Sequence, residues 1–246
     1  MMSRSDQQRI SNEPAYVLHA TPYKETSLVL QLFSRHHGRV AAIAKGAKRP
    51  HSALRGVLIS LQPLLVSWSG KGEVKTLTQA HWVGGQPALR GESLLQGFYL
   101  NELLLKLMAR EDAHETLFDH YRDALAALAT GAGRAETALR QFEFSLLREL
   151  GVGADWQKTS QGEAVLPQQR YVCLPEVGVR PVRGNEPADL PLLDGDILLA
   201  MAEGDFSGQR TLQQGKQLIR YWLHHLLSGR PLNTRQMLIE LHQIAP

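Results

Sequence analysis

The sequence predicts an α+β protein in which a small five-stranded barrel is followed by an α-helical domain. Short segments rich in β-forming residues fill roughly the first third of the chain, and tight turns separate them. After the sequence GGQP at residues 84–87, apolar residues recur instead at every third or fourth position, which is the period of an amphipathic helix. We therefore expect a polar extension over residues 1–13, a barrel over 14–84 and a helical domain over 88–246.

Five segments supply the predicted strands, at residues 14–20, 27–33, 39–44, 57–68 and 73–83. In the second, Leu28, Leu30 and Leu32 alternate with other side chains, as expected where one face of a strand is buried. The fourth is long and apolar, and Pro63 predicts a bulge or bend in it. Five strands of this size are typical of the OB-fold, whose exposed face and loops commonly bind oligonucleotides. An SH3-like barrel fits the pattern nearly as well.

The spacing of apolar residues predicts the helices. In the first, Leu95, Tyr99, Leu103 and Leu107 form one row and a second row lies beside it, so this helix should occupy the centre of a bundle. Further helices are expected at residues 117–128, 139–150, 194–202, 209–227 and 234–241, with Gly151 ending the third helix and Thr234 capping the last. Residues 152–192 are predicted to be an irregular insert that contains one hairpin, formed by 170–174 and 178–182.

The net charge of +3 conceals an uneven distribution along the chain. Residues 1–76 contain eleven lysine or arginine residues and four acidic residues, a net charge of +7, whereas the remainder carries −4. No acidic residue lies between Glu25 and Glu73. Because solubility does not require acids to be excluded, this one-signed field indicates a polyanionic partner, although a solvated basic surface is the alternative.

Basic side chains in the predicted barrel are therefore candidates for contacts with DNA phosphates, which position a strand without reading its bases. Lys45, Lys48, Arg49 and Arg55 share one Gly/Pro-containing loop, while Lys24 and Lys71 lie in neighbouring turns. The same acid-free stretch contains Arg35 and Arg39.

Aromatic residues among these cations are candidates for stacking on bases. Tyr23 and Trp68 are the two candidates, and each is also compatible with a place in the core. Phe33 lies in an apolar strand, so we expect it to be buried.

Catalytic and metal-binding motifs are absent from the sequence. It contains no P-loop, no Rossmann fingerprint and no GxSxG elbow, so no catalytic residue and no cofactor are predicted. The single cysteine, Cys173, excludes an intramolecular disulfide and a multi-cysteine zinc site, and the adjacent histidine pairs lack metal-ligand spacing. No apolar run reaches membrane-spanning length and the start of the chain is polar, so we expect a cytoplasmic protein that does not associate with membranes.

Four motifs, in order along the chain, match one known family. They are YVLHATPYKETSLVLQLFSRHHGRVAAIAKGAKRPHSALRG (16–56), QPLLVSWSGKGEVKTL (62–77), GFYLNELLLKLM (97–108) and ALRQFEFSLLRELGVG (138–153). Together they resemble the RecO family of bacterial DNA-repair recombination mediators, strongly over residues 14–153 and weakly elsewhere. The resemblance implies an N-terminal OB domain followed by a helical domain, which agrees with the fold predicted above.

The resemblance implies a non-enzymatic activity. Family members bind single- and double-stranded DNA and anneal complementary strands. They also bind the acidic C-terminal tail of single-stranded DNA-binding protein, and with RecR they help to load the RecA recombinase onto coated strands. The implied partners are therefore DNA, that acidic tail, RecR and, indirectly, RecA, with a nucleoid-associated location in the cytoplasm.

Arg140 matches the family arginine that contacts the acidic tail. Leu139, Phe142 and Leu146 could form an apolar groove with this cation at its rim. The alternative for Arg140 is a surface ion pair with Glu136, which would contribute only about 0.2–0.5 kcal/mol.

One feature departs from the family pattern. Some members carry a four-cysteine zinc element after the third predicted helix, but here residues 154–174 supply only Cys173. We expect packing around Trp156 and Tyr171 to stabilise this segment instead.

Two rival functions remain open at this stage. The protein could be an interaction adaptor that docks the acidic tail and RecR with little direct affinity for DNA. It could also be a small hydrolase or nuclease, which the absence of metal-ligand and nucleophile motifs disfavours.

Overall fold

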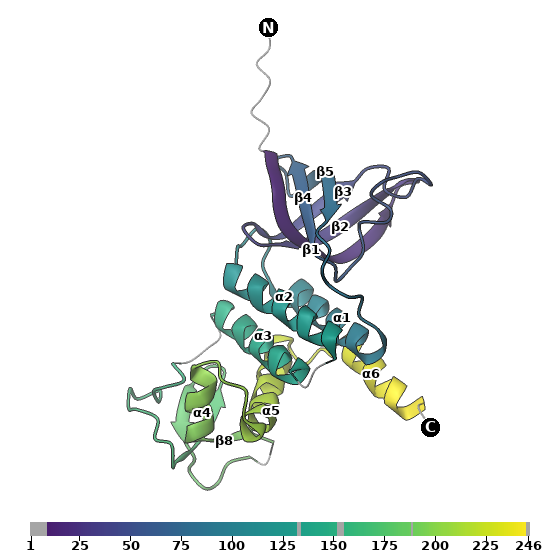
Figure 1. The fold of residues 1–246 in the computed structure, drawn as a ribbon. Coiled ribbons are helices and arrows are strands. Elements are labelled where there is room, and N and C mark those ends of the chain that lie inside the picture. Colours follow the sequence, from purple (N-terminus) through teal and green to yellow (C-terminus); the bar gives the residue numbers. More distant parts are fainter. Residues whose placement is uncertain (1–8, 132–133, 152–154, 188, 245–246) are drawn as a thin grey trace. The chain divides into compact units, whose positions relative to one another are not determined.

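The N-terminal part of the chain forms a closed five-stranded barrel in the computed structural model, which describes residues 9–131, 134–151, 155–187 and 189–244 (Figure 1). The strands are β1 (Arg9–Tyr23), β2 (Ser27–Ser34), β3 (Gly38–Ala44), β4 (Leu64–Ser69) and β5 (Val74–Trp82). They follow one another around the barrel in the order β1-β2-β3-β5-β4, and only the β3–β5 pair is parallel. The α+β class and the OB-fold predicted from the sequence are confirmed.

Alternation along the strands builds the barrel core. Leu30 and Leu32 of β2, Val40 of β3, and Val66 and Trp68 of β4 point inward and are buried together. Because successive side chains of a strand point to opposite faces, the residues between them point outward from the barrel. The predicted alternation in β2 is therefore confirmed.

Strand β1 starts earlier than predicted. Residues 9–13 were expected to belong to a polar extension, but Arg9 pairs with Ser69 and Glu13 pairs with Val66, so these residues form part of the barrel. The sequence pattern did not indicate a strand here for two reasons. Only Ile10 in this segment packs against the core, and Asn12, at φ 53°, interrupts the strand alternation. Asparagine tolerates this left-handed conformation better than most residues.

The predicted strand over residues 57–68 was too long. Strand β4 starts at Leu64, and the preceding residues form turns, in which the N–H of Ile59 donates to the carbonyl of Val57 at 2.7 Å. Leu61 has φ 67°, which is incompatible with an extended strand. The segment is apolar because Leu58 and Leu61 are buried, rather than because it pairs with a neighbouring strand.

Three helices pack with the barrel in one compact unit, residues 1–130 and 232–246, which we call the barrel unit. They are α1 (Gly91–Leu107), α2 (Glu115–Thr130) and α6 (Asn233–Ile244). Helix α1 contacts β1, α2 and α6, which confirms its predicted central position. Two outward-facing barrel residues, Tyr16 and Phe33, each pack against Phe118 and Tyr121 of α2.

Helix α6 is capped by a residue of another helix. We expected Thr234 to be its N-cap, but the helix already includes Asn233, and the carboxylate of Glu102 on α1 accepts from both main-chain N–H groups at 2.9 and 3.0 Å. The Thr234 hydroxyl donates to the same carboxylate at 2.7 Å. A carboxylate at a helix N-terminus satisfies N–H groups that have no partner within the helix.

Residues 131–231 form the second compact unit, which we call the inserted unit. It contains α3 (Ala135–Glu149), β6 (Arg170–Leu174), β7 (Gly178–Pro181), β8 (Leu192–Asp194), α4 (Gly195–Ala202) and α5 (Gln209–Leu226). The predicted hairpin is present as β6 and β7, and β8 adds a third antiparallel strand that the sequence analysis missed. The predicted boundary at residues 84–88 marks the change from strands to helices, whereas the compact units divide the chain elsewhere.

Aromatic packing stabilises the segment of the inserted unit around Trp156, as expected from the sequence. The Trp156 ring lies 5.3 Å from the rings of Phe144 and Trp222, and the indole N–H of Trp222 donates to the carbonyl of Cys173 at 2.9 Å. Tyr171 is fully buried, as expected, and its hydroxyl accepts from the N–H of Leu166.

Candidate nucleic-acid interface

Two neighbouring loops bring most of the predicted DNA-binding cations together. The β1–β2 turn contains Lys24, and the segment between β3 and β4 contains Lys45, Lys48, Arg49 and Arg55. The N–H of Lys48 donates to the carbonyl of Thr26 at 2.8 Å and joins the two loops. We call the following residues, all exposed, the basic loop cluster: Tyr23, Lys24, Lys45, Lys48, Arg49 and Arg55.

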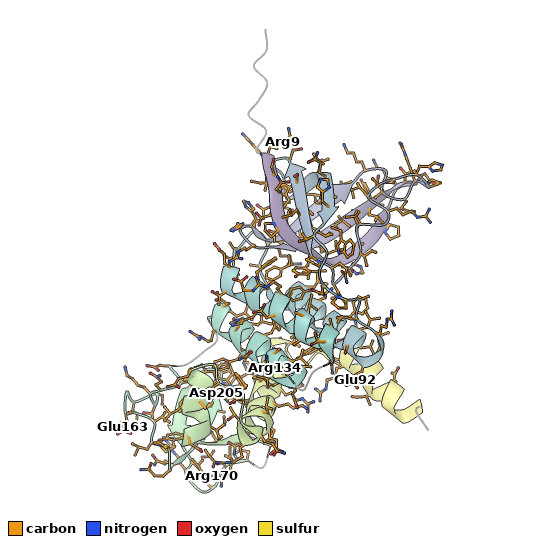
Figure 2. The ribbon with its side chains drawn as sticks, in the orientation of Figure 1. Arg9, Glu92, Arg134, Glu163, Arg170 and Asp205 are labelled. Carbon is orange, nitrogen blue, oxygen red and sulfur yellow. The ribbon has the colours of Figure 1, made fainter. Side chains whose placement is uncertain are left out.

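The loop between β3 and β4 is a folded segment built from consecutive turns. The N–H groups of Arg49, Ser52 and Arg55 each donate at 3.1 Å to the carbonyl three residues earlier. Its first turn begins at Gly46, whose φ of 69° is a left-handed conformation that glycine adopts readily. Ala47 and Leu58 are buried in the barrel core and anchor the loop at both ends, so the charged side chains face solvent. Side chains that end in nitrogen project from the barrel loops in Figure 2.

The outer face of β2 and β3 adjoins this cluster. Val29 pairs with Ile43 and Gln31 pairs with Ala41, and Val29, Gln31 and Ile43 are only half-buried. In OB-folds the face of the second and third strands, with the loop between the first two strands and the loop between the last two, commonly binds oligonucleotides. The basic loop cluster therefore borders the face on which such a ligand is expected.

Arg39 and Lys71 lie outside the cluster. Arg39 is half-buried on the outward side of β3, and its Nε is buried without a hydrogen-bond partner in the described part of the chain. Burial, together with the neighbouring charge of Arg110, lowers the pKa of Arg39. Lys71 is exposed in the β4–β5 turn. These two residues remain candidates, at positions separate from the loop cluster.

Arg35 was predicted to contact DNA, and in the structure its guanidinium forms ion pairs with two acidic residues of helix α2. Its Nε lies 3.3 Å from Glu115 and its Nη2 lies 2.9 Å from Asp119. Two acidic residues that lie far away in sequence thus pair with this arginine and tie the end of β2 to the helix, so less of its charge is available to DNA. The acid-free stretch around Arg35 gave no sign of these partners.

The predicted stacking residues differ in accessibility. Trp68 is 2% exposed inside the barrel and meets the His37 ring at an edge-to-face distance of 5.4 Å, so in this structure it cannot stack on a base. It was misjudged because a tryptophan in a half-buried strand can face either side. Tyr23 is 39% exposed, and the Lys24 ammonium lies 5.4 Å from its ring centroid. Phe33 is buried, as expected.

One exposed aromatic residue was missed. Trp82 at the end of β5 is 59% exposed, and its indole N–H donates to the Gln62 side chain at 3.3 Å. The sequence pattern did not reveal its exposure, because a register shift near Thr78 interrupts the alternation of buried and exposed residues along β5.

The residues that were expected to form a groove around Arg140 are buried. Arg140 of α3 is 6% exposed and pairs with Glu143 at 2.6 Å, while Leu139, Phe142 and Leu146 are buried in the inserted unit, where α3 packs against α5. The alternative pair with Glu136 is not formed either, because that carboxylate contacts Lys216 at 3.0 Å. The Nε of Arg140 is buried, and no hydrogen-bond acceptor within the described ranges satisfies it.

The described residues show no group of three or more histidine, cysteine or acidic side chains that could hold a metal ion. None of the helices described is long and apolar enough to cross a membrane.

Comparisons with known proteins identify the family. The family model described as "Recombination protein O N terminal" matches residues 9–86, and the one described as "Recombination protein O C terminal" matches residues 90–236. The chain belongs to the RecO family. The N-terminal match includes all five barrel strands and the whole basic loop cluster.

Several relatives are similar to this chain along most of their length. DNA repair protein RecO of Ralstonia nicotianae is 53% identical over 236 residues, which are 96% of this chain and 86% of that protein. The proteins of the same name from Polynucleobacter necessarius subsp. necessarius and Aromatoleum aromaticum are each 53% identical, over 240 and 243 residues, and this chain covers 98% and 100% of them. The RecO resemblance found in the sequence motifs is confirmed, and the chain is a RecO-family DNA repair protein.

Proposed function

We propose that this RecO-family protein is a recombination mediator that acts by binding rather than by catalysis. It binds single- and double-stranded DNA and anneals complementary strands. With RecR, it helps to load RecA onto strands coated by single-stranded DNA-binding protein, at the nucleoid in the cytoplasm. The basic loop cluster carries the proposal. Its five cations form no ion pair with any described carboxylate, so their charge is available to a polyanion.

The arrangement suits binding that does not depend on base sequence. Lysine and arginine side chains on a solvent-facing loop contact phosphates, and neutralised phosphates release their counterions. Tyr23 offers a stacking surface beside those cations, which a single strand can use because its bases are free. Neutralising two strands at one surface also reduces their mutual repulsion, which is the physical requirement for annealing.

A salt titration tests DNA binding. We expect fluorescence anisotropy of labelled single-stranded DNA to show a slope of log affinity against log salt near −3.5, for about five phosphates at about −0.7 each. The double variant Lys48→Glu/Arg49→Glu should bind at least tenfold more weakly to every sequence tested. The matched control Arg230→Glu/Arg235→Glu reverses two exposed cations outside the cluster and should bind like wild type. A flat salt response in the wild type would contradict the proposal.

A second site is proposed for the acidic tail of single-stranded DNA-binding protein, around Arg140 on α3. The observation that favours it is the buried guanidinium whose Nε has no acceptor and whose ion-pair partner is Glu143. A peptide carboxylate could satisfy this arginine if it reached the site in place of Glu143. Because the neighbouring apolar side chains are buried, docking would require local rearrangement of α3.

A peptide-binding experiment distinguishes the two candidate functions, recombination mediator and interaction adaptor. A labelled acidic-tail peptide should bind wild type, and Arg140→Gln should weaken it, while Arg148→Gln, which removes an exposed arginine from the same helix, should not. If the peptide binds through Arg140 but wild type has negligible affinity for DNA, the protein is an adaptor that docks the tail and RecR. Adding the peptide to the DNA titration shows whether the two ligands compete.

A further inference from the structure

Two arginines from separate elements lie side by side at the barrel surface. Arg39 belongs to β3, and Arg110 belongs to the connection between α1 and α2, residues 108–114. Their main chains form an isolated parallel β-bridge, and the N–H of Glu111 donates to the carbonyl of Arg39 at 3.0 Å. Both lie in the barrel unit.

The connection is held firmly against the barrel. Gly38 has φ 60°, and a Cβ atom at this position would lie 1.8 Å from the carbonyl oxygen of Asp112, so only glycine allows this approach. The ammonium of Lys75, which is buried in β5, lies 2.8 Å from the carboxylate of Glu111. Arg110 is therefore presented from a fixed main chain rather than from a free loop.

Carboxylates among the described residues balance the charges of the two arginines only in part. Arg39 forms no ion pair with the carboxylates described, and its buried Nε has no acceptor. The Arg110 side chain is 50% exposed, and its ion-pair partner is Glu73, at 4.0 Å on a side chain that is 91% exposed. Burial and Arg110 both lower the pKa of Arg39, which means that the guanidinium charge is disfavoured where it sits. Two arginines whose main chains adjoin and whose charges repel, one of them with an unsatisfied donor, are complementary to an anion that has several acceptor oxygens.

The position of the pair indicates which anion it binds. Arg39 lies on the outward side of β3, the strand face that OB-folds use for oligonucleotides, at the end where its cross-strand partner Phe33 is covered by α2. Arg110 lies beside Glu73 at the β4–β5 turn that also carries Lys71. The pair therefore borders the open part of this face. We infer that Arg39 and Arg110 together clamp one phosphodiester group of a DNA strand bound along this face. The inference rests on the proposed DNA binding and adds a contact from outside the barrel strands.

The clamp predicts opposite effects on stability and on binding. Arg110→Gln removes a like charge from beside Arg39, so the melting temperature without DNA should stay the same or rise. The same variant should bind single-stranded DNA about fivefold to tenfold more weakly, because a charge-assisted contact is lost. Glu73→Gln removes the competing carboxylate and should strengthen binding. A purely structural role for Arg110 predicts a lower melting temperature and no gain from Glu73→Gln.

The experiment measures anisotropy against salt for wild type, Arg39→Gln, Arg110→Gln, the double variant and Glu73→Gln. Arg122→Gln is the matched control, since it removes one arginine that Asp119 and Asp123 already neutralise. If both arginines hold one phosphate, the double variant should have a slope shallower by about 0.7. A slope shallower by about 1.4 in the double variant would mean that the two arginines contact separate phosphates, and it would overturn the inference. Unchanged DNA affinity in Arg110→Gln and Glu73→Gln would also overturn it.

Failure of the clamp and failure of the proposed function give different results. If wild type does not bind DNA, both are wrong. If wild type binds and Lys48→Glu/Arg49→Glu weakens it, but the arginine variants match the control, only the clamp is wrong. Loss of acidic-peptide affinity in Arg110→Gln with DNA affinity unchanged would also overturn the inference, because the pair would then serve a carboxylate ligand.

Discussion

The main-chain N–H of Lys48 donates a 2.8 Å hydrogen bond to the carbonyl oxygen of Thr26. This bond fastens the loop between β3 and β4 to the turn between β1 and β2. As a result, the cations of one loop lie beside the exposed ring of Tyr23 and the ammonium of Lys24 in the other. A single strand that reaches this corner of the barrel can contact positive charge and an aromatic face together.

Tyr23→Ala should therefore weaken single-stranded DNA binding more than double-stranded binding. Stacking of a base on an aromatic side chain contributes about 1–3 kcal/mol, and bases inside a duplex are not free to stack on protein. Tyr23→Phe keeps the ring and should retain the affinity. Anisotropy titrations with matched single- and double-stranded oligonucleotides check this expectation, and equal losses on the two ligands would show that the ring does not stack.

A buried chain of hydrogen bonds inside the barrel unit allows a second prediction, which concerns stability. The Asn101 amide donates to the carbonyl of Leu18 at 3.0 Å and accepts from the Tyr121 hydroxyl at 2.5 Å. Burial raises the pKa of Tyr121 well above its usual value, so the hydroxyl stays protonated and able to donate. Asn101→Leu should lower the free energy of unfolding by about 2–4 kcal/mol, because buried polar groups lose their partner.

The control for this chain is a double-mutant cycle. Tyr121→Phe alone should cost less than Asn101→Leu, and the two changes combined should cost less than the sum of the single losses. Urea denaturation of the four proteins measures the cycle. Strictly additive losses would mean that the two side chains are not coupled.

Local sequence patterns were sufficient to predict most of the barrel strands. The alternation of Leu28, Leu30 and Leu32 and the tight turns predicted the strands of the OB-fold, because inward and outward faces differ in polarity. The same rule failed for residues 9–13, where an irregular pairing at Asn12 hides the alternation, and for residues 57–63, which are apolar because they cover the core without pairing.

The candidate site was predictable only where it lies in one loop. Lys45, Lys48, Arg49 and Arg55 are close in sequence and stay close in space. The ion pairs of Arg35 were not predicted because its partners on α2 follow some 80 residues later, and Arg110 was missed because it joins Arg39 only through the docked connection. Such contacts depend on tertiary packing, which charge patterning along the chain does not report.

The single cysteine should be chemically inert in the folded protein. Burial raises the pKa of the Cys173 thiol to about 12, and the thiolate is the reactive form. A disulfide-exchange reagent at pH 8 should therefore fail to modify native protein and should modify one thiol after denaturation. Rapid reaction of the native thiol would show that the inserted unit opens readily around β6.

Low pH should weaken an ion pair in the inserted unit and with it the stability of the fold. The guanidinium of Arg180 binds the Glu186 carboxylate at 2.6 and 2.7 Å, and with the N–H of Arg183 it holds the pKa of Glu186 at about 2. Because the folded pKa lies below the unfolded value, this contact stabilises the fold above about pH 4.3, and the effect is lost as pH falls toward 2.

Glu186→Gln is the variant that checks this pH dependence. Its deficit in the free energy of unfolding relative to wild type should be present at pH 7 and should shrink between about pH 4.3 and 2. An NMR titration of the wild-type carboxyl group gives the pKa directly. A midpoint near 4 for Glu186 would contradict the ion pair.

The capping of α6 by Glu102 has a consequence for how the chain is made. Helix α6 packs on α1, yet the whole inserted unit separates the two in the sequence. Domains generally fold during synthesis from the N-terminus, so the barrel and α1 leave the ribosome long before the helix that covers α1 is translated. The inserted unit can be complete while the barrel unit still lacks its last helix. A premature stop shortly after residue 231 would therefore damage the unit that was synthesised first and spare the one synthesised second.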